Sequence, residues 1–139
     1  MSLVFFTDRD LGNTFPDILA SAGLTVERHF EHFPHDCPDE RWLQYVGDNK
    51  RLAITHDQRI RYKPNELAAV LRHRVALLVV VGKAPSSLLA RSFVATVPRI
   101  LAFAAEHEAP FIAKVHRASA PVSALNPGAP GSVSLWYPR

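Results

Sequence analysis

The chain has 139 residues, of which 47% are hydrophobic, and its formal net charge is +3. This length and composition predict one globular domain, and the weak positive charge permits binding to a polyanion without requiring it. The single cysteine excludes a disulfide framework, while the longest later apolar run, residues 75–81, is far too short to span a bilayer. Because Asp8 and Arg9 interrupt the N-terminal apolar run too early for a signal peptide, we expect a cytoplasmic protein without membrane contact.

The first predicted element is a short buried strand over residues 3–7 (LVFFT), which is apolar or β-branched without alternation. The strand stops at Asp8, Arg9 and Asp10, and Gly12 turns the chain. Apolar periodicity and turn residues then predict, in chain order, a helix over 13–22, a strand over 24–29, a helix that follows Asp36 and ends at Gly47, a strand over 51–55, a helix over 64–72, a strand over 75–81, a helix over 87–107 and a strand over 111–115.

This alternation of strands and helices predicts an α/β fold with a mostly parallel sheet of four or five strands and helices on both faces. Residues 75–81 should form a central strand, and residues 111–115 an edge strand. Ser, Ala, Pro and Gly dominate from Arg117 onward. Residues 117–139 are therefore predicted to be a flexible tail on a domain formed by residues 1–116.

Five acidic residues stand where the predicted elements meet one edge of the sheet. Asp8 and Asp10 follow the first strand, Asp39 and Glu40 begin a helix, and Asp57 follows the third strand. Because the carboxyl ends of parallel strands share one rim, all five carboxylates can converge there. Such a cluster suits Mg²⁺ or Mn²⁺ and is the usual apparatus for hydrolysing phosphodiesters. The structural alternative is that Asp39 and Glu40 serve the helix dipole and Asp57 caps a turn.

A basic segment follows the last of these acids. Arg59, Arg61 and Lys63 could hold a phosphate backbone beside a metal site, and Tyr62 could stack on a base. Arg9, between the first two acids, is a further candidate for nucleic-acid binding. The alternative for this segment is an ordinary solvated loop.

A second group of possible metal ligands lies in the polar loop before the second helix. His29, His32, His35 and Cys37 have the ligand types of a zinc site. Their spacing matches no closed zinc module, so a polar loop on the rim is the favoured interpretation.

Three motifs carry a resemblance to a known family. They are FFTDRDLG over residues 5–12, DERW over residues 39–42 and THDQRIRYKPNE over residues 55–66. With them, the chain resembles the PIN-like domains, in particular the VapC-type toxins, over most of residues 3–116. The segment RIRYKPNE is the most distinctive part of the match.

The resemblance implies a PIN-like three-layer α/β/α fold and a Mg²⁺- or Mn²⁺-dependent endoribonuclease. By position, Asp8, Asp39 and Asp57 correspond to the catalytic, metal-binding acids, and Glu40 is able to substitute for Asp39. Arg59 stands where many members carry a further acid, which implies either one metal or a replacement by Asp10 or Glu66.

The resemblance also implies partners. A toxin of a type II toxin–antitoxin pair cleaves RNA and is covered at its acidic rim by a cognate antitoxin protein. A homodimer through the helix over residues 87–107 is a further expectation, because that helix carries several large apolar residues, namely Leu88, Leu89, Phe93, Ile100 and Phe103. The same residues would equally serve an ordinary core.

Other functions fit parts of the sequence. The segment DRDLGNT is similar to the start of haloacid-dehalogenase-like phosphatases, but no paired acids follow the strand over residues 75–81, where that fold keeps late metal ligands. A phospho-receiver domain would use Lys114 near its last strand, but has no place for RIRYKP. A catalytically inactive PIN-like module that only binds a partner is the third alternative.

Overall fold

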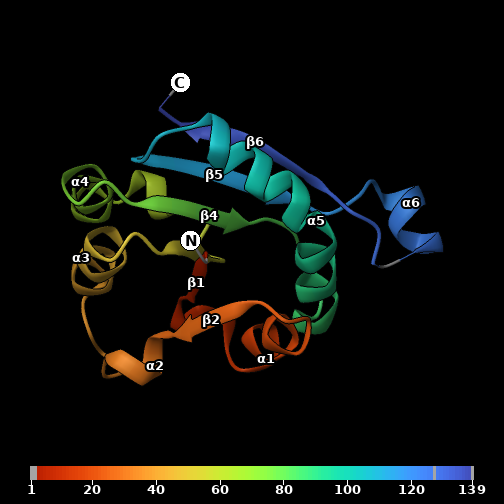
Figure 1. Ribbon diagram of the computed structural model, residues 1–139, viewed down its shortest axis with the longest axis horizontal. Helices are drawn as coiled ribbons and strands as arrows, with labels where there is room; N and C mark the ends of the chain where they lie inside the picture. The colour runs from red at the N-terminus through yellow and green to blue at the C-terminus, as the bar shows by residue number, and fades with distance from the viewer. Residues whose placement is uncertain (1–2, 127, 139) are drawn as a thin grey trace.

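Six short strands form one sheet in the computed structural model, which describes residues 3–126 and 128–138 (Figure 1). The strands are β1 (Val4–Thr7), β2 (Thr25–Arg28), β3 (Leu52–Thr55), β4 (Ala76–Val80), β5 (Phe111–His116) and β6 (Ser132–Tyr137). Their order across the sheet is β2-β1-β3-β4-β5-β6. The first five strands pair in parallel and β6 is antiparallel to β5, so the predicted α/β class with a mostly parallel sheet is confirmed.

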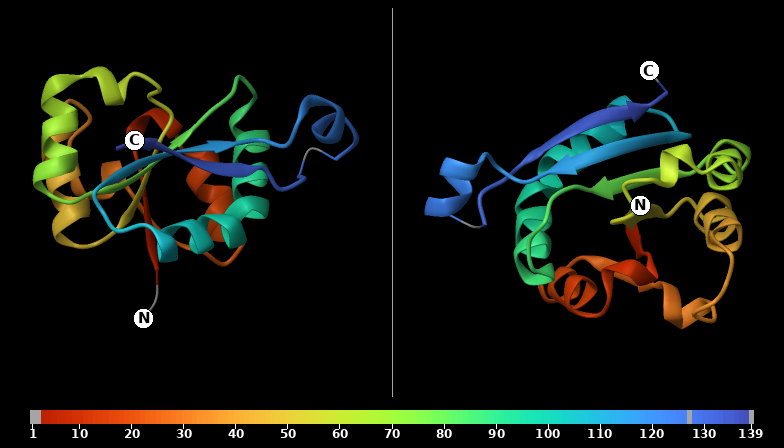
Figure 2. Two further views of the ribbon diagram at one scale, coloured as in Figure 1. Left: turned by 90° about the horizontal axis from the view of Figure 1, so that it is seen from above. Right: turned by 180° about the vertical axis from the view of Figure 1, so that it is seen from behind.

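Helices cover both faces of the sheet and give the predicted three layers (Figures 1 and 2). The helices are α1 (Thr14–Ser21), α2 (His29–His32), α3 (Asp39–Asp48), α4 (Pro64–Arg72), α5 (Ser86–Glu106) and α6 (Ala120–Leu125), with 3₁₀ turns η1 (Arg9–Leu11) and η2 (Ile60–Tyr62). Helices α1 and α5 pack on one face, and α3 and α4 on the other. The short α2 lies in the segment predicted to be a polar loop.

Consecutive residues of β1 supply the two cores, because side chains alternate along a strand. Phe5 packs with Phe15 of α1 and Phe93 of α5, whereas Phe6 stacks on Trp42 of α3 at a ring-centroid distance of 5.7 Å. Both phenylalanines are at most 1% exposed. The uninterrupted apolar run of β1 therefore reflects burial on both faces.

The path of the chain defines where a ligand can bind. The chain leaves β1 through α1 to the edge strand β2 and then returns past β1 through α3 to β3. Helices α1 and α3 consequently cover opposite faces, and the carboxyl ends of β1 and β3 form a topological switch point.

The C-terminal segment differs from the sequence-based expectation. Residues 117–139 were predicted to be flexible, but they contain α6 and β6, and β6 pairs with β5 over residues 112–116. Trp136 of β6 is only 9% exposed and belongs to the core on the α3 side. Strand β5 is thus not an edge strand, because the Pro/Gly-rich stretch is a connection that returns the chain to the sheet.

The homodimer predicted through helix α5 stays a prediction, and the core uses part of the apolar surface that was named for it. Leu89, Phe93 and Ile100 are at most 4% exposed and pack in the core against α1 and the sheet. By length and composition α5 could cross a membrane, a property that core helices share. A dimer would have to use other residues of this helix, of which Leu101 is 43% exposed.

Candidate active site

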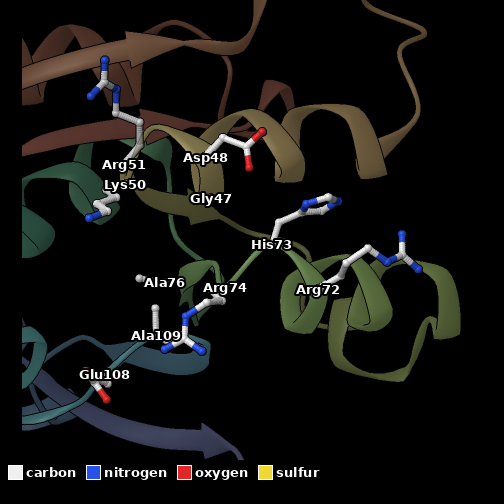
Figure 3. Close-up of a pocket in the computed structure, with 10 residues that line it drawn as sticks. All are labelled: Gly47, Asp48, Lys50, Arg51, Arg72, His73, Arg74, Ala76, Glu108 and Ala109. Atoms are coloured by element: carbon white, nitrogen blue, oxygen red, sulfur yellow. The ribbon is translucent and has the colours of Figure 1, made fainter.

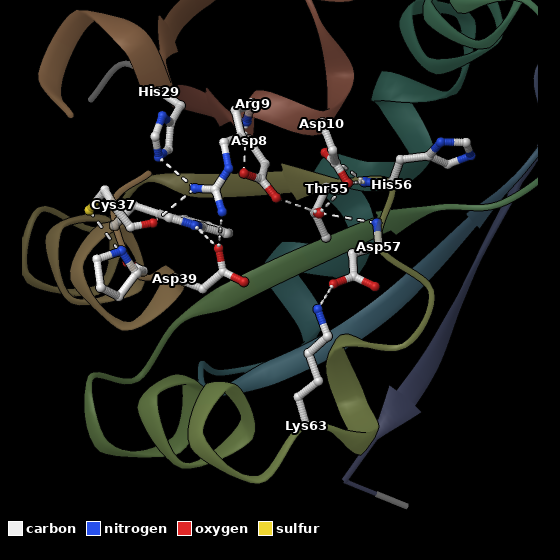
Figure 4. A network of polar contacts seen from close by, with 12 residues as sticks. Asp8, Arg9, Asp10, His29, Cys37, Asp39, Thr55, His56, Asp57 and Lys63 are labelled. Atoms are coloured by element: carbon white, nitrogen blue, oxygen red, sulfur yellow. Dashed lines mark hydrogen bonds and ion pairs between the residues drawn. The ribbon is translucent and has the colours of Figure 1, made fainter. Parts of the chain in front are cut away.

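A pocket of about 440 Å³ lies at the carboxyl ends of β1 and β3, at the switch point described above (Figure 4). It brings together four of the five predicted acids, from three separate segments of the chain. The residues that line it are Asp8, Arg9, Asp10, Asp39, His56, Asp57, Gln58, Arg59 and Lys63. Glu40 and Arg61, which were also predicted to belong to the site, are outside this lining, as is Glu66.

The first two acids are held by the 3₁₀ turn that follows β1. Asp8 caps this turn and accepts a hydrogen bond from the Arg9 amide at 2.7 Å, and Asp10 lies within the turn. At the end of β3, the buried Thr55 hydroxyl lies 2.9 Å from Asp8 Oδ2 and 3.2 Å from Asp10 Oδ2. The same hydroxyl accepts a hydrogen bond from the Asp57 amide at 3.1 Å. Thr55 therefore connects Asp8 and Asp10, which follow β1, to Asp57, which follows β3.

The carboxyl of Asp8 is in an unfavourable place for a negative charge. Asp8 is only 6% exposed, and burial together with the nearby charges of Asp10 and Asp39 raises the pKa of its carboxyl group to about 7. Hydrogen bonds from Thr55 and the Arg9 amide lower this pKa but do not outweigh the effect of burial. Burial of its carboxyl group also raises the pKa of Asp10, although hydrogen bonds from the His56 amide and Thr55 oppose this. Negative charge on this pair is thus incompletely compensated by the protein.

The other two acids each have a cationic partner (Figure 4). Arg9 Nη2 lies 3.3 Å from Asp39 Oδ1, which also accepts a hydrogen bond from Trp42 Nε1 at 2.9 Å. Lys63 Nζ lies 2.6 Å from Asp57 Oδ2. Burial alone would raise the pKa of Asp57, but Lys63 and the Arg59 amide outweigh it and lower that pKa.

The guanidinium of Arg9 is fixed in place by three contacts from α3 and the segment before it. Besides Asp39, it donates to the Cys37 carbonyl oxygen at 3.0 Å and lies 3.2 Å from His29 Nε2. His29 is 2% exposed, and burial and the Arg9 charge lower its pKa. His29 and Cys37, two of the possible zinc ligands, therefore support Arg9.

Sequence reasoning missed Thr55 and His56 as members of the site. Thr55 is the last residue of the predicted strand over residues 51–55, and His56 follows it directly. Their place at the carboxyl end of a strand beside Asp57 is the signal that could have identified both.

The donor atoms of the pocket suit a hard divalent cation, because carboxylate oxygens are the ligands that Mg²⁺ and Mn²⁺ prefer. Asp8 and Asp10 fit this role best, since they share a hydroxyl group and carry raised pKa values. Asp39 and Asp57 could bind the cation only after their ion pairs with Arg9 and Lys63 are broken. Consistent with these pairings, no group of three or more His, Cys, Asp and Glu side chains within residues 3–126 and 128–138 is placed to hold a metal ion.

A larger cavity of about 590 Å³ lies at the opposite end of the sheet, before β3, β4 and β5 (Figure 3). Several basic residues line it, but two of them are already engaged. Arg51 Nε donates to Glu27 at 2.8 Å, and Arg74 Nη2 donates to the Ala109 carbonyl oxygen at 2.7 Å. None of the predicted acids lines this cavity, so the smaller acidic pocket is the candidate active site.

Comparison with known proteins identifies the family of this arrangement. No curated protein and no solved structure matches the chain. The model of one family, described as the PIN like domain, matches residues 3–82, which is more than half of the chain and extends from β1 past β4. Domains of this kind are generally nucleases and typically use divalent metal ions. The match includes every acid of the pocket, and this chain therefore belongs to the PIN-like domain family.

Proposed function

We propose that this protein is a Mg²⁺- or Mn²⁺-dependent endoribonuclease that hydrolyses RNA phosphodiester bonds. The observation that carries the proposal is the convergence of four carboxylates in one pocket, with Asp8 buried and its pKa raised to about 7. Membership of a family of nucleases supports the same reaction class. Basic side chains at the edge of the pocket support a polyanionic substrate.

The residues of the pocket divide into two roles. Asp8 and Asp10 would hold the divalent ion, which supplies an activated water and stabilises the charge that develops on the phosphate. Asp39 and Asp57 complete the acidic wall and are the further catalytic candidates. Arg59 and Lys63 line the same pocket and are placed to neutralise the phosphate groups of an RNA chain. Thr55 fixes the spacing between the acids of β1 and Asp57.

The biological setting that we propose is a type II toxin–antitoxin pair in the cytoplasm. Its support is the resemblance of FFTDRDLG and RIRYKPNE to VapC-type toxins. The incompletely compensated negative charge of Asp8 and Asp10 favours an antitoxin that inserts a basic side chain into the pocket. A homodimer remains compatible with this proposal.

The test is cleavage of a mixed RNA pool. Wild-type protein should cleave with Mn²⁺ or Mg²⁺, and cleavage should stop with a chelator and in Asp57→Asn. The matched control is Asp48→Asn, which changes an exposed acid on the same α3 side of the sheet and far from the pocket lining. Cleavage that survives both the chelator and Asp57→Asn would refute the proposal.

A second candidate is a PIN-like module that binds RNA or a partner without cleaving it. The observation in its favour is that Arg9 and Lys63 already neutralise Asp39 and Asp57. RNA binding without metal-dependent cleavage would identify this case. The phosphatase alternative has no such support, since residues 81–83 after β4 place no carboxylate in the pocket.

A further inference from the structure

A cluster of aromatic and cationic side chains lies on η2, β5 and β6, outside the acidic pocket. We call it the aromatic platform, and it consists of Arg61, Tyr62, Lys114, Trp136 and Tyr137. The guanidinium carbon of Arg61 lies 5.4 Å from the Tyr62 ring centroid, 5.7 Å from that of Trp136 and 5.5 Å from that of Tyr137. Lys114 Nζ lies 4.2 Å from the Trp136 ring, and the Tyr62 and Trp136 rings meet edge to face at 5.8 Å.

An irregularity in β6 makes this cluster possible. Tyr137 pairs with Ile112 and Leu135 with Ala113, so Trp136 is the extra residue of a β-bulge. In a regular strand Trp136 and Tyr137 would point to opposite faces of the sheet. Here both pack against the core on the α3 side, and both rings reach Arg61. The bulge therefore gathers two consecutive aromatic residues on the face that η2 approaches.

The η2 turn connects the aromatic platform to the acidic pocket. Arg59 before the turn and Lys63 after it both line the pocket, and Figure 4 shows Lys63 reaching from this turn to Asp57. Ile60, which is 1% exposed, anchors the turn in the core. Arg61 and Tyr62 therefore lie in the chain between two residues of the pocket lining.

We infer that the aromatic platform binds single-stranded RNA next to the acidic pocket, with one base stacked on the Tyr62 ring. This inference rests on the proposed function, because it takes the substrate of the pocket to be RNA. Tyr62 is 67% exposed, so its ring is accessible to a base, and Arg61 and Trp136 both contact that ring. Base stacking on aromatic rings tolerates any sequence, and the neighbouring cations neutralise the phosphates.

A purely structural role for this cluster accounts for less of what is observed. Shielding Trp136 requires only Arg61 and Lys114, both of which are half-buried. It does not require a large ring that remains two-thirds exposed at Tyr62. The charge of the surroundings, with Arg59, Arg61 and Lys63 in one turn, favours a polyanion as the occupant.

The experiment is a binding measurement by fluorescence anisotropy with a short labelled oligouridylate, in the presence of a chelator so that no cleavage occurs. Tyr62→Ala should weaken binding about 5-fold or more, because loss of a stacked ring typically costs about 1–3 kcal/mol. Tyr62→Phe should bind within about twofold of wild type. The salt dependence of binding should be unchanged in Tyr62→Ala, whereas Arg59→Ala should reduce the log–log slope by about 0.7.

Linear polyphosphate, which offers phosphates without bases, is the control ligand. Its affinity should be the same for wild type and Tyr62→Ala, and equal melting temperatures should show that both are folded. If wild type binds RNA and Tyr62→Ala binds it equally well, the aromatic platform is refuted and the proposed function stands. An equal loss for RNA and polyphosphate would also refute stacking. If wild type fails to bind RNA, both proposals fall.

Discussion

Asp8 shows how a single buried carboxyl group links stability to the proposed function. Its ordinary pKa of 3.8 is raised to about 7 in the folded protein, chiefly by burial and then by Asp10. Between these two values the folded state keeps a proton that the unfolded state has lost. The stabilisation is therefore present at low pH and is lost as the pH rises toward about 7.

This linkage predicts the effect of Asp8→Asn in the absence of metal. With a chelator, the free energy of unfolding of the wild type should fall relative to Asp8→Asn as the pH rises from about 4 to about 7, by at most about 1.4 kcal/mol per pH unit. Above about pH 7 the variant should be the more stable protein. Urea denaturation across this range measures the difference, with Asp48→Asn as control. Parallel curves for wild type and Asp8→Asn would contradict the predicted charge burial.

For single residues, the sequence predicted which acids lie near one another, but it did not predict which cation pairs with which acid. That Asp8, Asp10 and Asp57 would meet follows from the rule that parallel strands end on one rim. The ion pair between Arg9 and Asp39 could not be predicted, because it depends on the tertiary placement of α3 and of His29 beside Arg9. The roles of these residues in catalysis stay predictions.

The element that sequence analysis did not anticipate is β6. Its residues, SVSLWY, include four of apolar or aromatic type, but the preceding Pro- and Gly-rich stretch favoured disorder. Tertiary hydrogen bonds to α5 hold the strand in place. The Gly131 amide donates to Thr96 Oγ1 at 2.9 Å, and Arg99 donates to the Gly131 carbonyl oxygen, so α5 fixes the start of β6. A contact between residues so far apart in sequence leaves no local pattern.

Gly131→Ala tests this anchor. A Cβ atom at Gly131 would lie 1.6 Å from the His116 carbonyl oxygen, so the start of β6 would have to shift. We expect the variant to lose about 1–3 kcal/mol of unfolding free energy in urea denaturation. Gly128→Ala is the matched control, since its nearest neighbour is a side-chain atom at 3.7 Å, and it should change stability by at most about 0.5 kcal/mol. Equal stability of the two variants would argue against the anchor.

For the whole molecule, the fold class was predictable and the limit of the folded unit was not. Strictly alternating strand and helix patterns permit little besides a parallel sheet with covered faces. The position of β6 depends instead on which strand of the sheet has an unpaired edge. That strand is β5, and this is known only when the order of the strands in the sheet is known. Strand β6 pairs along β5 and buries Trp136, so it belongs to the sheet.

Truncation after Arg117 should therefore harm the protein as a whole. Without β6, the backbone groups of β5 would be exposed along an edge that is largely apolar, which promotes association between chains. We expect the truncated protein to unfold at lower urea concentration and to elute as larger species in size-exclusion chromatography. Full-length protein at the same concentration is the control. A truncated chain as stable and monodisperse as the full chain would restore the view of residues 117–139 as a dispensable tail.

The hydroxyl group of Thr55 makes the hydrogen bonding of Asp8 and Asp10 unequal at any one moment. Its hydroxyl group accepts from the Asp57 amide and has a single hydrogen to donate, yet oxygen atoms of Asp8 and Asp10 both lie within 3.2 Å of it. That hydrogen can form a well-aligned bond with only one of the two acids at a given instant. A hydroxyl rotor in the fast, picosecond-to-nanosecond range of small side-chain motions would alternate between them. Each acid would then periodically present its Oδ2 atom to an incoming ligand without the hydrogen bond from Thr55, although neither carboxyl group has moved.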